Sequence, residues 1–501
     1  MSRMATVALT IDGLPVLAAE GANVLTAAAG AGIEIPHFCY HPAFEAEGSC
    51  RMCLVEIEGL PKLELACSTA VREGMVVRTT TPRVLGARKD ILGFFLAEHP
   101  LDCPICDKAG ECLLQDHYDR HGRFPSRFLE PKEKRGKLVP IGRDLVLDRE
   151  RCILCTRCVR FLRKVTKTGE LGVFERGVRS EIGIYDDAAV DNDYSGNLVD
   201  ICPVGAITHR DFRFKTRAWF LDKRPTVCPR CSRGCAVTIE SVSGYPLGPR
   251  DRRVFRIRAR ENPAVNGHWI CDLGRSGRSD VDATRRTRVA RRDAAVEEIT
   301  WQRAAAELAD RIREIPGPGR GERMAVVLTS FMTCEELLLA RRLFVEGLGI
   351  GRVFFADPPP GASDGFLLTA ERTPNLRGAQ EAGFSPRPPD LEGLKKPADV
   401  LIVFGHHLTG LFSGEALAGA LGNSGTKVLL SAKTGPLDRL FDVVIPLAVT
   451  AEKAGTFINV GGIRQSFGRG VDPLPGVPAE SDILVLTANS LGLRSGETDA
   501  R

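Results

Sequence analysis

The sequence predicts a multidomain chain in which an α+β half is followed by a parallel α/β domain. Up to residue 272, short alternating strands and short helices are interrupted by 15 of the 16 cysteines. After about residue 278, near-continuous apolar strands are separated by helical stretches, a pattern typical of a parallel sheet covered on both faces. At 501 residues the chain is long enough for about three to five domains.

The N-terminal region, residues 1–82, is expected to form a small sheet packed on one helix. The segment VALTIDGLPVLA (7–18) alternates on both sides of Asp12-Gly13, which predicts a β-hairpin. The alanine-rich NVLTAAAGAG (23–32) ends in glycine and predicts a short helix. RMCLVEIEG (51–59) alternates again as a strand.

The middle of the chain changes character twice. Residues 83–143 begin with the helical ARKDILGFFLAEH (87–99) and continue with the basic, loop-like EPKEKRGK (130–137). Residues 144–220 and 221–277 are two further cysteine-bearing modules with short elements.

The C-terminal region, residues 278–501, is predicted to be a parallel α/β domain. WQRAAAELADRIREI (301–315) places Trp301, Ala305, Leu308 and Ile312 on one helical face. Strands are expected at residues 324–330, 399–405, 426–432 and 441–447.

Composition and charge narrow the function classes. A net charge of +5 is too small to imply nucleic acid, and the basic run RRTRVARR (285–292) is interpreted as a solvated linker. No apolar run approaches the roughly 20 residues of a membrane span. Asp12, Gly13 and Pro15 interrupt any signal-peptide core. We therefore expect a reducing cytoplasmic setting, in which clustered cysteines indicate metal binding.

The first ligand set has the general arrangement of a plant-type [2Fe–2S] site. A C-x2-C pair is preceded by one cysteine and followed by another: Cys39, Cys50, Cys53 and Cys67. Ten residues separate the first cysteine from the pair, where plant ferredoxins have four. A four-cysteine zinc site is the alternative.

The second set adds a histidine to three cysteines. His99, Cys103, Cys106 and Cys112 have the spacing H-x3-C-x2-C-x5-C. A neutral imidazole in place of a thiolate would raise the potential of an iron–sulfur cluster, and a Cys3His zinc site fits the same residues equally well. His117 is a competing, less favoured ligand.

The third set gives the strongest local signal. C-x2-C-x2-C is followed by a remote cysteine before Pro203, the bacterial pattern for [4Fe–4S]: Cys152, Cys155, Cys158 and Cys202. A two-cluster ferredoxin would have a further cysteine where this chain has Leu162, so one cluster is predicted.

The fourth set is a C-x2-C-x3-C run with a distant partner: Cys228, Cys231, Cys235 and Cys271. This spacing suits [4Fe–4S], with a zinc ribbon as the alternative. Only Cys334 remains outside the four sets, and a lone cysteine is usually a small core residue.

At this point the sequence resembles a known family. GSCRMCLVEIEGLPK, HPLDCPICDKAGECLLQD, RCILCTRCVRF and GNLVDICPVGAITHRDFRFKTRAWFL are similar to the large iron–sulfur subunit, or G subunit, of NADH:quinone oxidoreductase. The resemblance implies an N-terminal ferredoxin-like β-grasp domain with one [2Fe–2S], and three [4Fe–4S] clusters on the other sets, with His99 as an iron ligand.

The same resemblance implies a relay without substrate chemistry of its own. Its partners would be a flavoprotein subunit, which holds FMN and oxidises NADH, and other peripheral-arm subunits of complex I, with indirect attachment to the membrane arm at the cytoplasmic face of the inner membrane. The implied domains are 1–82, 83–143, 144–220, 221–277 and 278–501.

The C-terminal domain resembles a shortened molybdopterin oxidoreductase. AEKAGTFINVGGIRQ (451–465) is similar to that superfamily's E-x-x-G-T-x-x-N signature. About 220 residues are too few for the full cofactor fold, so no molybdenum cofactor is expected. GLGIG (347–351) follows a helix and precedes a strand, the reverse of a dinucleotide-binding loop.

Two other oxidoreductases compete with this interpretation. The catalytic subunit of an NAD-linked molybdenum or tungsten formate dehydrogenase has a similar N-terminal half, but Leu162 and the short C-terminal domain count against it. The relay subunit of a NiFe hydrogenase should stop soon after Cys202, whereas this chain continues.

Overall fold

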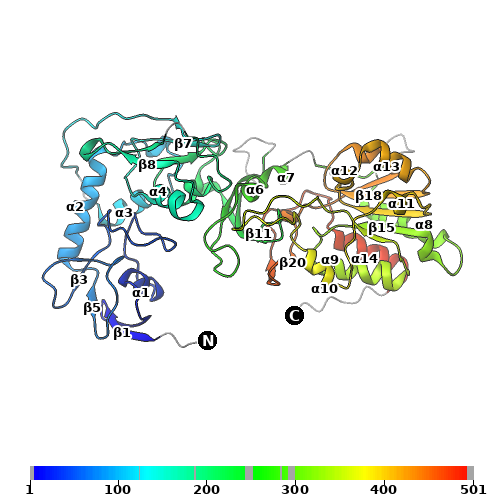
Figure 1. Ribbon diagram of the computed structural model, residues 1–501, viewed down its shortest axis with the longest axis horizontal. Helices are drawn as coiled ribbons and strands as arrows, with labels where there is room; N and C mark the ends of the chain where they lie inside the picture. The colour runs from blue at the N-terminus through cyan, green and yellow to red at the C-terminus, as the bar shows by residue number, and fades with distance from the viewer. Residues whose placement is uncertain are drawn as a thin grey trace. The chain divides into compact units, whose positions relative to one another are not determined.

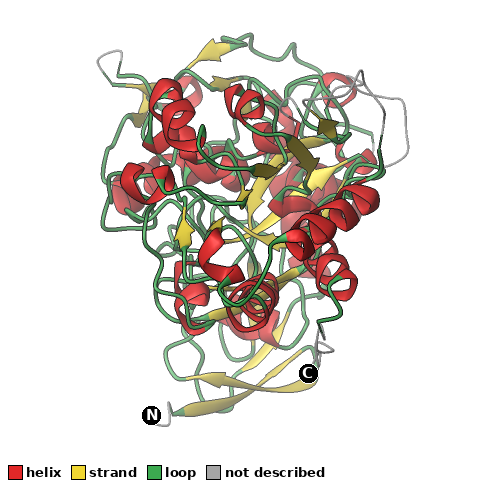
Figure 2. Cartoon of the chain, turned by 90° about the vertical axis from the view of Figure 1, so that its right-hand side faces the viewer, coloured by secondary structure: helices red, strands yellow, loops and turns green. Residues whose placement is uncertain are grey.

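The computed structural model describes residues 5–122, 125–185, 188–242, 252–282, 285–291 and 299–493. The chain forms two compact units, Met1–Leu221 and Asp222–Arg501, each described by itself below. In Figure 1 the first unit runs from blue to green and the second from green to red. Loops and turns, green in Figure 2, make up much of the chain between the helices and strands.

The first unit begins with a five-stranded mixed sheet of order β2-β1-β5-β3-β4. Its strands are β1 (Thr6–Ile11), β2 (Leu14–Ala19), β3 (Leu54–Ile57), β4 (Glu64–Leu65) and β5 (Val76–Arg78). The predicted hairpin is confirmed, with Ile11 paired to Leu14 across the turn. Helix α1 (Val24–Gly30) contributes Val24 and Ala28 to the core of this sheet. This helix begins where the Asn23 side chain accepts a hydrogen bond from the Thr26 N–H at 2.8 Å.

The rest of the first unit consists of short elements around the cysteine loops. The helical elements are α2 (Pro82–Glu98), η1 (Cys103–Ile105), α3 (Leu113–His121), α4 (Arg157–Phe161), η2 (Leu162–Thr166), η3 (Gly177–Arg179), α5 (Asn197–Ile201) and η4 (Ala218–Phe220). Strands β6 (Val139–Pro140), β7 (Leu145–Leu147) and β10 (Ile207–His209) form a three-stranded sheet. Strands β8 (Leu171–Phe174) and β9 (Glu181–Ile184) form a hairpin.

The second unit begins with an antiparallel sheet of β11 (Asp222–Val227), β12 (Ala236–Ser241) and β13 (Val254–Ala259). Helices α6 (Asp272–Arg275) and α7 (Arg278–Asp282) follow and contact β13.

A six-stranded sheet of order β14-β19-β18-β17-β15-β16 forms the predicted α/β domain. The strands are β14 (Ala290–Arg291), β15 (Met324–Leu328), β16 (Val353–Phe355), β17 (Val400–Phe404), β18 (Thr426–Ser431) and β19 (Val443–Pro446). All neighbouring pairs are parallel except β14 with β19. The four predicted strands are therefore confirmed, each to within two residues at either end.

Helices cover both faces of this sheet (Figure 1). Met324, Val326 and Leu328 of β15 pack in one core with residues of α8 (Trp301–Glu314), α9 (Cys334–Ala340) and α14 (Glu480–Ser490). Ala325 and Val327 pack in the other core with residues of α11 (Leu391–Lys395), α12 (Leu408–Leu411) and α13 (Gly414–Leu421). Both faces are apolar because both are buried, which explains the unbroken apolar runs.

The remaining elements of the second unit connect or follow these layers. They are η5 (Arg320–Arg323), η6 (Arg341–Gly347), α10 (Leu376–Glu381), η7 (Pro436–Leu440), η8 (Thr450–Glu452) and the hairpin of β20 (Gly455–Ile458) with β21 (Arg464–Phe467). GLGIG lies between η6 and β16, as the sequence predicted. None of the helices in the described ranges has both the length and the apolar character of a membrane span.

The interpretation of RRTRVARR as a solvated linker is wrong for Arg285 and Arg286, whereas Thr287, Arg288 and Arg291 are exposed. The Arg285 side chain is only 6% exposed and pairs with Glu452 at 2.8 Å. Arg286 pairs with Asp438 at a similarly covered position, and Ala290–Arg291 form the antiparallel edge strand β14. Arg292 lies outside the described residues. Arg285 and Arg286 are covered because acidic partners from distant parts of the chain fold against them.

Candidate functional site

The first set lies in the loop between α1 and β3 and just after β4. All four thiols are buried: Cys39, Cys50, Cys53 and Cys67. Backbone N–H groups point at the sulfurs, including that of Phe38, which lies 3.4 Å from Cys50 Sγ. A hydrogen bond with Cys50 lowers the pKa of Cys39 to about 5, and a hydrogen bond with Cys53 lowers the pKa of Cys67. Buried sulfurs that accept N–H groups suit anionic thiolate ligands.

The second set surrounds one small cavity. His99 at the end of α2, Cys103 on η1, and Cys106 and Cys112 before α3 all line it. Burial lowers the pKa of His99 to about 4, with the nearby Arg151 adding to the effect, so the imidazole is neutral. Among the described residues, none is hydrogen bonded to the buried His99 Nδ1. A neutral imidazole with a free buried nitrogen fits a metal ligand.

The competing His117 lies elsewhere. It is absent from the residues that line this cavity, and its Nε2 lies 3.4 Å from the His37 carbonyl oxygen. Its ring packs against Phe38 beside the first set, with ring centroids 5.1 Å apart. The structure therefore brings His99, and not His117, together with the three cysteines of the second set.

Two residues that sequence reasoning missed complete this cavity. Gly205 lies against Cys106, since a Cβ at Gly205 would be 2.1 Å from Cys106 Sγ. The buried Arg151 side chain also lines the cavity, and it donates to Asp102 at 2.9 and 3.1 Å. The glycine two residues after Cys-Pro was a readable signal for close backbone approach.

The third set lines a second cavity with mostly apolar walls. Cys152, Cys155, Cys158 and Cys202 share it with side chains such as those of Leu147 and Ile182. Burial raises the pKa of the Cys152 and Cys155 thiols to about 12, and each also lies near another cysteine of the set. Leu154 and Thr156 have positive φ values of 51° and 57°, and the Leu154 N–H lies 3.4 Å from Cys152 Sγ.

Two arginines connect the third set to the first. The Arg160 guanidinium donates to the carbonyl oxygens of both Cys39 and Cys155. Arg157, whose side chain is buried, donates to the Tyr40 and Ile201 carbonyl oxygens. Both arginines stand within the CTRCVRF segment itself, Arg157 between Cys155 and Cys158 and Arg160 two residues after Cys158, and sequence reasoning did not use this signal.

The fourth set belongs to the second unit, where all four thiols are buried: Cys228, Cys231, Cys235 and Cys271. Cys228 follows β11 and donates its N–H to the Cys235 carbonyl oxygen at 2.8 Å. Cys271 precedes α6, and its sulfur lies 3.3 Å from the Gly274 N–H. Burial raises the pKa of Cys271 to about 11.

No three His, Cys, Asp or Glu side chains within the described residues converge as they would on one metal ion.

Cys334 is buried at the start of α9, with its sulfur 3.5 Å from Asn375 Oδ1. Burial raises the pKa of this thiol. Its surroundings are those of a core cysteine.

The second unit also contains a cavity of about 430 Å³. Residues that follow the carboxyl ends of β15, β17 and β18 line it, among them Phe331, His407 and Lys433. The Phe331 and His407 rings are stacked, with centroids 4.9 Å apart. Cys228 of the fourth set forms part of the wall.

Four family models match successive parts of the chain. They describe a 2Fe-2S iron-sulfur cluster binding domain (4–82), an NADH-ubiquinone oxidoreductase-G iron-sulfur binding region (88–127), an NADH-quinone oxidoreductase subunit 3 ferredoxin-like domain (142–208) and a molybdopterin oxidoreductase Fe4S4 domain (221–283). The chain therefore carries both [2Fe–2S]- and [4Fe–4S]-binding domains.

Curated relatives are named as the G subunit of NADH-quinone oxidoreductase. That of Streptomyces coelicolor is 42% identical over 273 residues, which are 54% of this chain and 31% of the relative. That of Rickettsia bellii is 38% identical over 344 residues, or 68% of this chain and 48% of the relative. The predicted resemblance to this large iron–sulfur subunit is confirmed, and the chain spans less than half the length of the relatives it matches.

Two solved structures were also matched. One is titled as an NAD+-reducing [NiFe]-hydrogenase in the H2-reduced state, at 33% identity over 42% of this chain and 91% of that chain, with a TM-score of 0.39. The other is acetylene hydratase from Pelobacter acetylenicus, at 11% identity over 54% and 69% of the two chains, with a TM-score of 0.37. At such TM-scores neither match defines the fold.

Proposed function

We propose that this chain is an electron-relay subunit of an NADH:quinone oxidoreductase, equivalent to its large iron–sulfur subunit. The [2Fe–2S] cluster is assigned to the Cys39 set, and one [4Fe–4S] cluster to each of the His99, Cys152 and Cys228 sets. These groups would supply one-electron transfer when bound. The five-domain division at residues 82, 143, 220 and 277 is part of this proposal.

One observation carries the relay proposal: residues that neighbour the third set in sequence contact both other sets of the first unit. Arg160 binds the carbonyl oxygens of Cys39 and Cys155 together. On the other side, Gly205 lies against Cys106, and the Leu113 N–H donates to the Pro203 carbonyl oxygen at 3.0 Å. The contacts favour the order first set, third set, second set along the relay.

The protein's own contribution is to hold the ligands and to set their surroundings. The cavity of the third set has mostly apolar walls, which exclude water. Arg157 and Arg160 place positive charge beside sulfurs that would become anionic. Backbone N–H groups near Cys50 and Cys152 donate to sulfur in the same sense. These are the features by which proteins tune cluster potential.

His99 is proposed as the fourth iron ligand of the second set. Its ring is buried and neutral, and one ring nitrogen has no partner among the described residues. His117 is less suitable because its ring faces the first set.

Electrons would reach the chain from a partner. We assign NADH oxidation and FMN to a flavoprotein subunit, and the onward path to other peripheral-arm subunits, at the cytoplasmic face of the inner membrane. The names of the curated relatives support the coarser statement that the chain is one subunit of a multi-subunit NADH-quinone oxidoreductase. They give no support to the formate dehydrogenase alternative.

Metal analysis of the anaerobically purified chain, with low-temperature EPR after dithionite reduction, tests the proposal. We expect about 14 iron per chain and no molybdenum or tungsten, from one [2Fe–2S] and three [4Fe–4S] clusters. Stoichiometric zinc in place of iron, or stoichiometric molybdenum or tungsten, would contradict it.

A further inference from the structure

The loop that carries Cys231 and Cys235 is held by residues more than 220 positions away. The Val460 N–H donates to the Ser232 carbonyl oxygen at 2.8 Å. Asn459 Nδ2 donates to the Arg233 carbonyl oxygen at 3.2 Å, and Gln465 Nε2 donates to that of Gly234 at 2.8 Å. Three consecutive carbonyl groups between two ligand cysteines thus depend on the β20–β21 hairpin.

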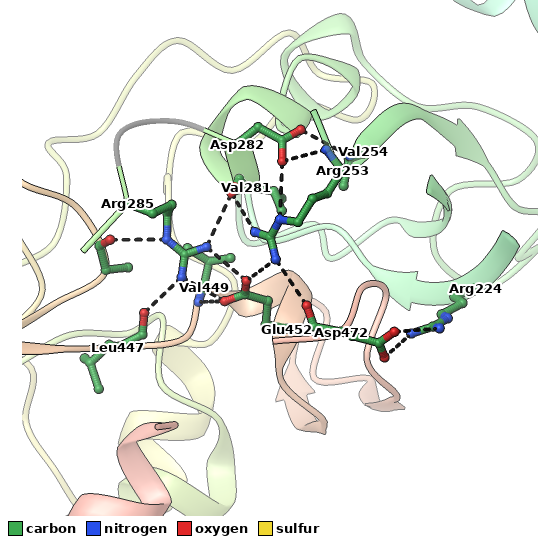
Figure 3. Close-up of polar contacts among 11 residues, drawn as sticks. Arg224, Arg253, Val254, Val281, Asp282, Arg285, Leu447, Val449, Glu452 and Asp472 are labelled. Atoms are coloured by element: carbon green, nitrogen blue, oxygen red, sulfur yellow. Dashed lines mark hydrogen bonds and ion pairs between the residues drawn. The ribbon is translucent and has the colours of Figure 1, made fainter. Parts of the chain in front are cut away.

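The base of the same hairpin is fixed by a buried charge cluster (Figure 3). The Glu452 carboxylate is completely buried and accepts from Arg253 at 2.8 Å and from Arg285 at 2.8 and 3.0 Å. The Val449 N–H donates to the same carboxylate at 2.9 Å. An ionised carboxylate is tolerated in such a place only because two guanidinium groups compensate its charge.

Both arginines also contact the end of α7, the second helix after Cys271. Arg253 and Arg285 each donate to the Val281 carbonyl oxygen, at 2.9 and 3.3 Å. Asp282 accepts from the N–H groups of Arg253 and Val254, each at 3.1 Å, and so ties α7 to the start of β13 (Figure 3).

Two residues of the E-x-x-G-T-x-x-N signature therefore lie at the two places where the β20–β21 hairpin is anchored. We call the hairpin, with its contacts to the loop and to the charge cluster, the clamp. Glu452 stands at the base of the hairpin and Asn459 at its turn, where it also accepts from the Ile463 N–H at 2.8 Å. Gly455 and Thr456 lie between them, and the Thr456 N–H donates to Glu335 at 3.0 Å. The proposed function assigns no molybdenum cofactor to this chain, so the contacts of the signature need another explanation.

We propose that Asn459 and Gln465 are positioning residues for the fourth set, and that Glu452 holds their hairpin in place for this purpose. The loop between Cys231 and Cys235 reaches its ligand geometry only when the hairpin is docked. This gives the C-terminal α/β domain a function: it completes a metal site whose ligands all lie before residue 272. The inference rests on the proposed assignment of a cluster to the Cys228 set.

The test compares full-length variants by iron and acid-labile sulfide content and by EPR after reduction. Asn459→Ala and Gln465→Leu each remove a donor to the loop, and Glu452→Gln weakens the base of the clamp. Cys228→Ser defines the iron and the EPR component that belong to the fourth set. Asp472→Asn is the matched control, because it removes a 64% exposed carboxylate that pairs with Arg224 beside the clamp and leaves the loop contacts intact (Figure 3).

We expect Asn459→Ala and Gln465→Leu to lose up to about four iron per chain and the EPR component that Cys228→Ser removes. The other EPR components should persist, and Asp472→Asn should match the wild type. Full iron and an intact component in both loop variants would overturn the inference, as would equal loss from all four sets. If Cys228→Ser itself costs no iron, the cluster assignment fails, which is a different result from failure of the clamp.

Discussion

Replacement of Gly205 by alanine should remove the cluster of the His99 set while leaving the fold intact. An alanine Cβ at this position would lie 2.1 Å from Cys106 Sγ. Ordinary non-bonded contacts are about 3.5–4.0 Å, so the two atoms must separate by about 1.5 Å. The backbone has little room to retreat, because the neighbouring Val204 and Ala206 are only 1% and 2% exposed.

The cheaper response is rotation of the Cys106 thiol. The other atoms near the new Cβ are Lys108 Cβ at 3.3 Å and Arg151 Cδ at 3.7 Å, which need little adjustment. Folding should therefore cost no more than about 1–3 kcal/mol, the usual cost of overpacking. Metal ligands tolerate displacements of only about 0.2 Å, so a sulfur moved by more than that no longer binds in place.

Iron analysis and EPR of the purified variant measure the effect. We expect Gly205→Ala to fall from about 14 to about 10 iron per chain and to lose one [4Fe–4S] signal. Gly93→Ala is the control, because a Cβ there meets nothing within 4 Å and alanine favours the helix α2. Full iron and an unchanged spectrum in Gly205→Ala would refute the reasoning about close approach.

Three further predictions concern His99, His407 and Cys334. His99→Cys should keep a cluster but lower its midpoint potential in a redox titration, because an anionic ligand replaces a neutral one. His117→Ala should leave that potential unchanged. An unchanged potential in His99→Cys together with a changed potential in His117→Ala would make His117 the ligand. Burial lowers the pKa of His407 to about 3. Below about pH 6.5 this histidine is therefore protonated in the unfolded chain but stays neutral in the folded chain. The free energy of unfolding should decrease as the pH falls from about 6.5 toward 3. At pH 5 this loss is about 2 kcal/mol. The His407→Phe variant keeps a ring against Phe331 and should not show this loss when the unfolding free energy is measured in urea at pH 5 and pH 7. An equal change in unfolding free energy between the two pH values for both proteins would contradict the prediction. Cys334→Ala should retain all iron, and loss of any cluster would show that this thiol is more than a core residue.

Short-range patterns in the sequence were sufficient for most of the elements. The hairpin around Asp12-Gly13 and the strands at 324–328 and 400–404 follow from alternation and from apolar runs, which are local properties. The iron–sulfur domains were also predictable, because a cluster-binding loop needs its cysteines at fixed short spacing. The helix over residues 301–314 was found because its apolar face repeats at helical spacing.

Contacts between distant segments could not be read in the same way. Local sequence cannot show that Arg285 meets Glu452, and a run of arginines is usually solvated, so Arg285 and Arg286 were misinterpreted. Nor did the signature at 451–465 reveal that Asn459 supports a loop 226 residues earlier. Such pairings depend on how the chain folds back on itself.

The sequence by itself determined the candidate ligands of this protein: four sets, the spacing within each set, and one histidine beside fifteen cysteines. Tertiary structure alone decided which candidates come together. It placed His99 in one cavity with Cys106 and placed His117 next to His37, because His99 caps the end of α2 whereas His117 lies within α3. It also placed the third set in contact with the first and the second, since burial and hydrogen bonding of the arginines depend on partners that no local pattern specifies.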